Sequence, residues 1–352
     1  MTHPKTGLFS ALDGPGEDAA GKVLVSAQNI EIENADKLTL RYWNYLRDYL
    51  EKQSGTPGLN TCNTLYFDTP DFDLLQSGLK PGMPLADSQG SGLTLRDRLG
   101  GRSTDGDVFE DQFSVKRIHA DYSKLASNLT RRQYPGQEIK QEYLPYVRME
   151  DEFAHRHSRH VSEYRYGDFP AEIQSMIADR LGTRAKNMVY KPQLVTFVPR
   201  SRYQVFLNPH DAYNFILPAK FKEEKRPPLN DYVCIEVAMD KCTHKRPPPG
   251  MNIADILTSD RKTPGFKFLR LDLLAEREFK GDRSGPQLTD KTLVATYARF
   301  AMFLYDLAQP FASDPKDGPP IRPVMSKLTL GMETLLESAA MGRATELSRL
   351  AP

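Results

Sequence analysis

Several segments of the chain alternate between charged and apolar residues, which is the period of a β-strand with two different faces. Residues 93–99 read Leu-Thr-Leu-Arg-Asp-Arg-Leu, so that Arg96 and Arg98 share one face and the leucines share the other. Residues 112–116 and 198–203 repeat this pattern, and the basic residues that they add are Lys116, Arg200 and Arg202. Cations that converge from several strands predict a site for a polyanion, most simply a phosphate chain.

Carboxylates alternate with apolar residues in three other segments, residues 30–33, 232–240 and 276–280. The acidic residues that this places on charged strand faces include Glu31, Glu33, Glu236, Glu276 and Glu278. Carboxylates two residues apart can hold a hard divalent cation such as Mg²⁺ or Mn²⁺, which accepts phosphate oxygens as further ligands. The two sets of charges together therefore predict a site for a metal–triphosphate complex.

The same alternation is also typical of an antiparallel sheet with one face in solvent, which would contain no tunnel. In a tunnel, the charged faces would line the lumen and the aliphatic faces would be covered by helices. The presence of three cationic strands favours the tunnel.

A run at residues 65–75, Leu-Tyr-Phe-Asp-Thr-Pro-Asp-Phe-Asp-Leu-Leu, is followed by Gly78 and by the arginine segment at residues 93–98. This order resembles the Tyr-Tyr-Asp-Thr-Pro-Asp to Leu-Arg-Ile-Arg segment of the CYTH, or triphosphate tunnel metalloenzyme, superfamily. That superfamily includes inorganic, thiamine and RNA triphosphatases, class IV adenylyl cyclases and polyphosphate polymerase domains. The resemblance covers residues 25–281, with its best matches at residues 64–117. It implies an α+β fold, in which an antiparallel β-barrel with a charged lumen is flanked by helices.

The resemblance also implies roles for individual residues. The phosphate-binding set would be Arg96, Arg98, Lys116, Arg200, Arg202 and Lys37. The metal set, for Mg²⁺ or Mn²⁺, would be Glu31, Glu33, Glu236, Glu276 and Glu278, with Glu31 and Glu33 also catalytic. The chain departs from the family at its first strand, which in the family reads Glu-x-Glu-x-Lys. Here Ala35 stands where the lysine is expected, and Lys37 follows two residues later.

The expected activity is metal-dependent hydrolysis of a phosphoanhydride bond in inorganic triphosphate or an organic triphosphate. A noncatalytic module that binds polyphosphate or a nucleotide is the alternative that Ala35 favours. A polyphosphate polymerase or a nucleotidyl cyclase would use the same tunnel with a different nucleophile. The charge pattern is common to all of these, so only the reaction products distinguish them.

Three regions are expected along the chain. Residues 1–22 form a disordered leader, residues 23–285 the barrel with an insertion at 121–190, and residues 286–352 a helical C-terminal extension. Helices are predicted at 38–52, 171–181, from 288 to about 307 and at 323–350. The extension is interpreted as a dimer interface, a lid for one tunnel mouth, a partner-docking element or packing on the barrel.

Composition bounds the remaining expectations. A net charge of +1 over 352 residues gives no sign of general nucleic-acid binding. Three cysteines cannot form a disulfide framework, which makes a reducing, cytoplasmic setting the default. No window approaches the roughly 20 apolar residues of a membrane-spanning helix, so no membrane partner is expected. Asp68, Asp71 and Asp73 are expected to cap a short helix and not to bind metal.

Overall fold

The structure is a computed structural model of the chain. It describes residues 26–77, 94–99, 112–121, 146–154, 159–208, 233–279, 290–312, 319–324, 327, 330–335 and 337. At residues 26–34, 94, 98–99, 112–121, 146–154, 278–279 and 290–295 the description covers the backbone only.

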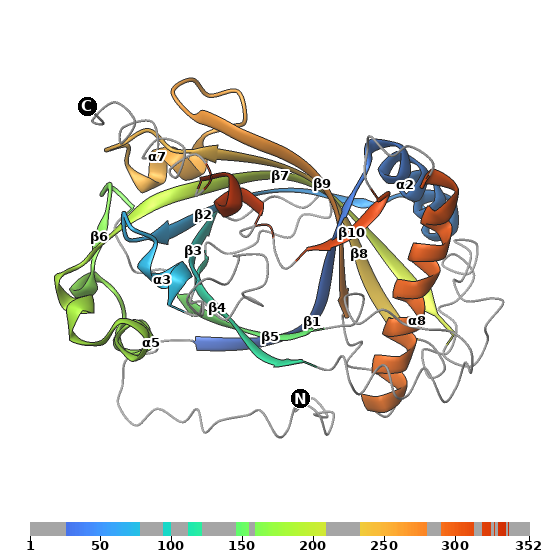
Figure 1. Ribbon diagram of the computed structural model, residues 1–352, viewed down its shortest axis with the longest axis horizontal. Coiled ribbons are helices and arrows are strands. Elements are labelled where there is room, and N and C mark those ends of the chain that lie inside the picture. Colours follow the sequence, from blue (N-terminus) through green and yellow to red (C-terminus); the bar gives the residue numbers. More distant parts are fainter. Residues whose placement is uncertain are drawn as a thin grey trace, which may run out of the picture.

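Eight antiparallel strands form a closed ring (Figure 1). In ring order these are β1 (Ser26–Leu38), β5 (Tyr146–Ala154), β4 (Gln112–Asp121), β3 (Thr94–Leu99), β2 (Gly58–Asp68), β7 (Val189–Leu207), β8 (Val233–Arg246) and β9 (Lys267–Phe279). The ring closes where β9 pairs with β1, from Glu33 opposite Glu278 to Lys37 opposite Leu274. Closure satisfies the backbone groups that an open sheet leaves at its edges. The predicted α+β fold with an antiparallel barrel is confirmed.

Two further strands extend this ring. The short β6 (Tyr164–Arg165) pairs with the start of β7. At the C-terminal end of the chain, β10 (Ile321–Val324) pairs with β1 over residues 35–38, just beyond the part of β1 that pairs with β5.

One side of the barrel is covered by α2 (Leu40–Ser54) and α8 (Asp290–Ala308) (Figure 1). The helices bury the apolar faces of β7 and β8, because Tyr203, Val205, Ile235 and Val237 pack against them. Helix residues of this cluster are Tyr42, Leu46, Leu50, Tyr297, Phe300, Leu304 and Ala308. The hydroxyl of Tyr42 donates a hydrogen bond to the carbonyl of Leu304, so the two helices are also joined directly. The 3₁₀ turn η6 (Gln309–Phe311) follows α8.

A second apolar cluster covers the outer faces of β2, β3 and β7. It is formed with α5 (Ala171–Leu181), α7 (Ile253–Thr258), and the 3₁₀ turns η3 (Tyr166–Asp168) and η4 (Gly182–Asn187). Tyr164 packs between Phe67 and Phe169, with ring centroids 5.2 and 5.6 Å away. The helix predicted at 171–181 is confirmed to the residue. Both outer clusters leave the opposite strand faces for the interior of the barrel.

The short helix α3 (Asp73–Gln76) follows β2 and is held by a buried carboxylate. Asp68 accepts hydrogen bonds from the backbone N–H groups of Thr69 (2.7 Å), Leu74 (3.0 Å) and Leu75 (2.9 Å). Burial raises the pKa of Asp68 to about 7, although these hydrogen bonds act in the opposite direction. The capping role expected for Asp68 is therefore confirmed.

Two parts of the chain differ from the sequence interpretation. The segment expected as an insertion, residues 121–190, contains β5, which is a member of the ring between β1 and β4. Where a helix is predicted from residue 323, the chain first forms β10, and helical residues are described at 327 and from 330. The three cysteines are free thiols. No helix within the described ranges is both long and apolar enough to cross a membrane.

Candidate functional site: the charged lumen

Odd-numbered residues pack with the outer helices in the stretches 203–207 of β7 and 233–239 of β8 and at Ala275 of β9, so the even-numbered residues beside them face the inside of the barrel. Arg200, Asp240 and Glu276 lie on three adjacent strands of this inner surface, and Arg200 contacts both carboxylates. The charged faces thus line the lumen, as the sequence alternation predicts.

A four-member charge cluster is centred on Arg200. Its Nε and Nη2 atoms lie 2.7 and 2.8 Å from the two carboxylate oxygens of Asp240, and Nη2 also contacts Glu276. Lys327, from the C-terminal extension, places its Nζ 2.7 Å from Asp240 and 2.6 Å from Glu276. Burial lowers the pKa of Arg200, but Asp240 and Glu276 outweigh it and the net shift is upward. Two cations and two carboxylates therefore balance within this cluster.

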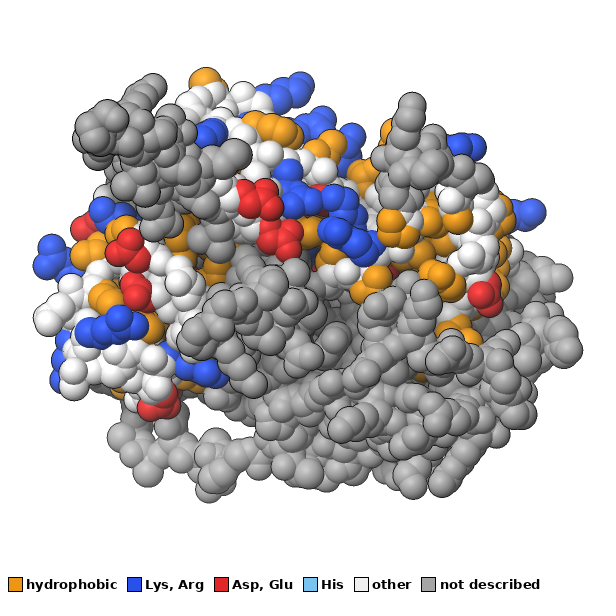
Figure 2. All heavy atoms as spheres, viewed as in Figure 1, with side chains coloured by type: hydrophobic (Ala, Val, Ile, Leu, Met, Phe, Trp, Pro, Cys, Tyr) orange, Lys and Arg blue, Asp and Glu red, His pale blue; other side chains and the backbone are white. Residues whose placement is uncertain are grey.

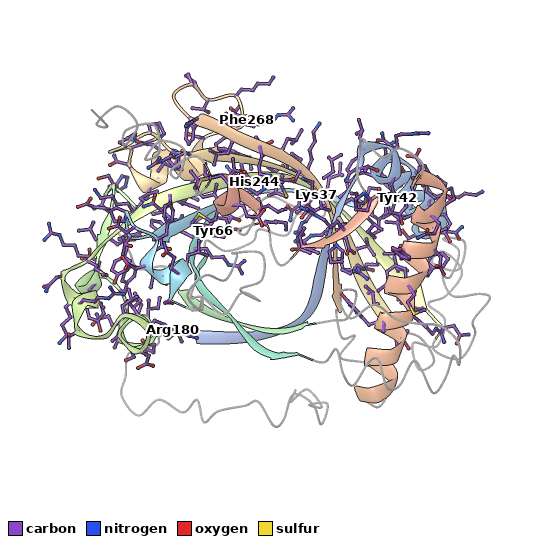
Figure 3. All side chains as sticks on the ribbon, in the orientation of Figure 1. Lys37, Tyr42, Tyr66, Arg180, His244 and Phe268 are labelled. Carbon is purple, nitrogen blue, oxygen red and sulfur yellow. The ribbon has the colours of Figure 1, made fainter. Side chains whose placement is uncertain are left out.

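A second network surrounds Asp272 on β9. The Nζ of Lys37 lies 2.7 Å from Asp272 Oδ1, and the Nε of Arg270 lies 2.7 Å from Oδ2. Burial raises the pKa of Asp272, but the hydrogen bonds from Lys37 and Arg270 outweigh it and lower the pKa overall. His244 is fully buried, with Nε2 3.5 Å from Asp272 and Nδ1 3.0 Å from the hydroxyl of Thr196. Figure 3 shows Lys37 and His244 along the upper part of the barrel wall.

Glutamates from three neighbouring strands lie in one cross-strand row. Glu33 of β1 stands opposite Glu278 of β9, which stands opposite Glu236 of β8. Neighbouring strands lie about 4.8 Å apart, so these residues are adjacent positions on the sheet. Arg202 of β7 approaches the same row, with its Nε 3.5 Å from Glu236 Oε1. The fifth predicted metal residue, Glu31, lies opposite Arg148 of β5.

The remaining predicted cations lie on β3 and β4. Arg96 is buried and stands opposite Tyr66 on β2 and Ser114 on β4. Arg98 is two residues further along β3, and Lys116 of β4 lies opposite Glu150 of β5. The side chains of Arg98, Lys116, Glu31, Glu33 and Glu278 lie outside the described part of the chain.

The departure from the family pattern at residue 35 has a defined position in the barrel. Asp36 points outward and pairs with the buried Arg277, at 2.5 Å between Oδ2 and Nη2. Its neighbours along the strand, Ala35 and Lys37, therefore face inward. Ala35 stands directly opposite Glu276, whereas Lys37 reaches Asp272 instead.

Sequence reasoning missed several lumenal residues. Asp272 lies between Leu271 and Leu273 and shares a strand face with Glu276. The period-two alternation of charged and apolar residues therefore predicts its position. Nothing local marks His244 or Lys327, because their partners are distant in sequence. Within the described side chains, no group of three or more His, Cys, Asp or Glu is placed to hold a metal.

The inner surface of the closed barrel thus carries cations and carboxylates that pair along neighbouring strands. This closed antiparallel barrel with charged residues on its inner surface is the fold that the sequence predicts.

Comparison with known proteins adds distant likenesses of fold. No protein-family model matches the sequence, and no curated protein matches it. Similar solved structures include a candidate adenylate cyclase from Bacillus halodurans (12% identity, TM-score 0.37, 79% of this chain and 90% of that chain covered). A candidate adenylyl cyclase from Hippeastrum, described as having a dominant triphosphatase activity, gives 12% identity, a TM-score of 0.36 and coverage of 86% and 95%. A chain of the Schizosaccharomyces pombe Mediator head module has 12% identity and a TM-score of 0.34, with 80% of this chain and 96% of that chain covered.

Proposed function

We propose that the chain binds a triphosphate in its lumen and hydrolyses a phosphoanhydride bond with a divalent cation. The observation that carries the proposal is the row of Glu33, Glu278 and Glu236 on three adjacent strands, next to the lumenal Arg202. In this proposal, carboxylates for a hard cation and a guanidinium for phosphate oxygens come from neighbouring positions of the sheet.

The lumenal carboxylates fit a metal to different degrees. Glu33, Glu278 and Glu236 supply the carboxylate oxygens that Mg²⁺ or Mn²⁺ prefers, and we propose that they hold it. Glu276 and Asp240 fit less well, because each already contacts both Arg200 and Lys327. When bound, the cation would neutralise charge on the phosphate oxygens.

The chain's own residues bind and orient the substrate in this proposal. Arg96 on β3 and Arg202 on β7, the two strands that flank β2, bind nonbridging phosphate oxygens, with Arg98, Lys116 and Lys37 as further cations. Glu31 and Glu33 are the proposed carboxylates that accept the proton of the attacking water. The wall of fixed charges stabilises a transition state whose charge is spread over several oxygens.

The test is phosphate release from inorganic triphosphate, ATP and thiamine triphosphate, each with magnesium, manganese or chelator. Arg96→Ala should weaken triphosphate binding by tenfold or more, whereas Glu33→Gln should keep binding and abolish turnover. Arg180→Ala and Glu172→Gln, both at exposed positions of α5, are the matched controls. Unchanged triphosphate binding in a folded Arg96→Ala protein would refute the proposal.

A noncatalytic triphosphate-binding module is the second candidate. It is favoured by Ala35, which removes a cation from the first strand, and by the mutual neutralisation of Asp240 and Glu276 with Arg200. Tight triphosphate binding without phosphate release under any metal condition would select this candidate. Release of pyrophosphate or growth of a phosphate chain would instead indicate a cyclase or polymerase.

A further inference from the structure

The C-terminal extension places part of itself against the inner face of the barrel (Figure 1). Leu330 packs with Val198 of β7, Cys242 of β8 and Leu274 of β9. Met332 and Leu335 belong to a cluster that contains Tyr66, Phe72, Leu75 and Leu194. These partners include inward-facing residues of β2, β7, β8 and β9, so residues 330–335 of the extension pack on the lumenal side of the wall.

Polar contacts and close packing hold this segment in place. Arg270 Nη1 donates a hydrogen bond to the carbonyl of Leu330 (3.0 Å) and lies 3.7 Å from Glu333 Oε2. At Gly331, an added Cβ would lie 2.5 Å from Leu194 Cδ2 and 3.0 Å from His244 Nδ1. A larger residue at position 331 would therefore force the side chain of Leu194 to move. Figure 2 shows acidic and basic side chains gathered on the surface between β10 and the helical residues 330–335.

Lys327 carries the charge of this segment into the lumen. Burial and the neighbouring Arg200 lower its pKa, but Asp240 and Glu276 outweigh them, so that the net pKa is raised and the ammonium stays charged. Its Nζ contacts Glu276, the residue directly opposite Ala35. The methyl group of Ala35 leaves the wall without a charge at this position, and the ammonium at Glu276 comes from the extension instead.

We propose that Lys327 is a triphosphate-binding residue, and that the C-terminal extension supplies the cation that the barrel wall lacks at Ala35. This rests on the proposed function. Removing Lys327 would leave two carboxylates and one arginine in its charge cluster, and the added negative charge would repel a polyanion. Triphosphate affinity then depends on whether the extension is seated in the lumen.

The experiment moves the lysine that contacts Glu276 from position 327 to position 35. Lys327→Met should weaken binding of inorganic triphosphate by tenfold or more in calorimetry and should lower the melting temperature of the ligand-free protein. Adding Ala35→Lys to Lys327→Met should restore both, because residue 35 faces Glu276 directly. Lys327→Arg should keep most of the affinity. Lys186→Met, at an exposed position of η4, is the control and should change neither quantity.

Gly331→Val tests the seating of the segment without removing a charge. Because its side chain would collide with Leu194, it should displace the extension and reproduce the loss of affinity. Affinity equal to wild type in Lys327→Met, or no recovery in the double variant, would overturn the inference.

The two proposals fail in different ways. Wild-type protein that binds no triphosphate would overturn the proposed function and the ligand-binding role of Lys327 with it. The melting temperatures of ligand-free Lys327→Met, with and without Ala35→Lys, would still show whether a lysine at residue 35 can replace Lys327 as the cation at Glu276. If wild type binds triphosphate and Lys327→Met binds it equally well, the inference is overturned and the proposed function is not.

Discussion

Acidification should destabilise the barrel through one buried histidine. His244 has no exposed surface, and burial lowers its pKa from the ordinary 6.5 to about 4, against the attraction of Asp272. The folded protein therefore holds the imidazole neutral where the unfolded chain protonates it. The stability that this provides is fully present above pH 6.5 and is lost as the pH falls towards 4.

The size of the effect follows from the shift. One pKa unit corresponds to about 1.4 kcal/mol, so the whole linkage is about 3 kcal/mol and about 2 kcal/mol of it is lost at about pH 5. Asp272 is affected differently, because its pKa is lowered and its own contribution is lost only below the ordinary carboxyl range.

Urea denaturation of wild type and His244→Gln between about pH 7.5 and about pH 4.5 measures this contribution. The wild-type unfolding free energy should fall more steeply with acid than that of His244→Gln, by about 2 kcal/mol at about pH 5. His160→Gln, at an exposed site, should follow wild type. Parallel curves for wild type and His244→Gln would refute the reasoning, because the histidine would then titrate alike in both states.

Three further substitutions test the packing of the barrel by denaturation. Asp36→Asn leaves the buried Arg277 without its carboxylate between β1 and β9, so it should cost about 3–5 kcal/mol, and Asp36→Leu with Arg277→Met should recover much of this. Asp68→Ala removes the acceptor of three backbone N–H groups and should cost about 1–2 kcal/mol, unlike the exposed Asp71→Ala. Leu46→Ala opens a cavity under α2 and should cost about 2–5 kcal/mol; stability equal to wild type would contradict the packing described.

The sequence allowed the barrel to be predicted wherever one face of a strand is clearly apolar. Residues 93–99 and 232–240 show such alternation, and the structure places both in the ring. The strand β5 was interpreted as part of an insertion, because Arg148, Glu150, Asp151 and Glu152 give it the composition of a solvated loop. A strand with charge on both faces is recognised only from its neighbours, and those are distant in sequence.

The sequence predicts which charged residues line the candidate site, but it does not predict which of them form ion pairs. The sequence predicts Arg200 as a phosphate-binding cation, and the structure shows that it also donates hydrogen bonds to both carboxylate oxygens of Asp240. Lys327 carries no local signal, since a lysine in a predicted helical tail is usually on the surface. Only the register between β1 and β9 shows that this lysine meets the carboxylate opposite Ala35.

The closure of the ring between β1 and β9 has a consequence for how the chain folds. The first strand of the barrel pairs with the last, so the ring has a high contact order and is expected to form slowly. Until β9 leaves the ribosome, β1 and β8 each keep an edge that can pair with another chain. The lumenal extension follows β9 in the chain, so its lysine reaches Asp240 and Glu276 only after the walls around them exist. The interior charges are thus balanced in the last step of assembly.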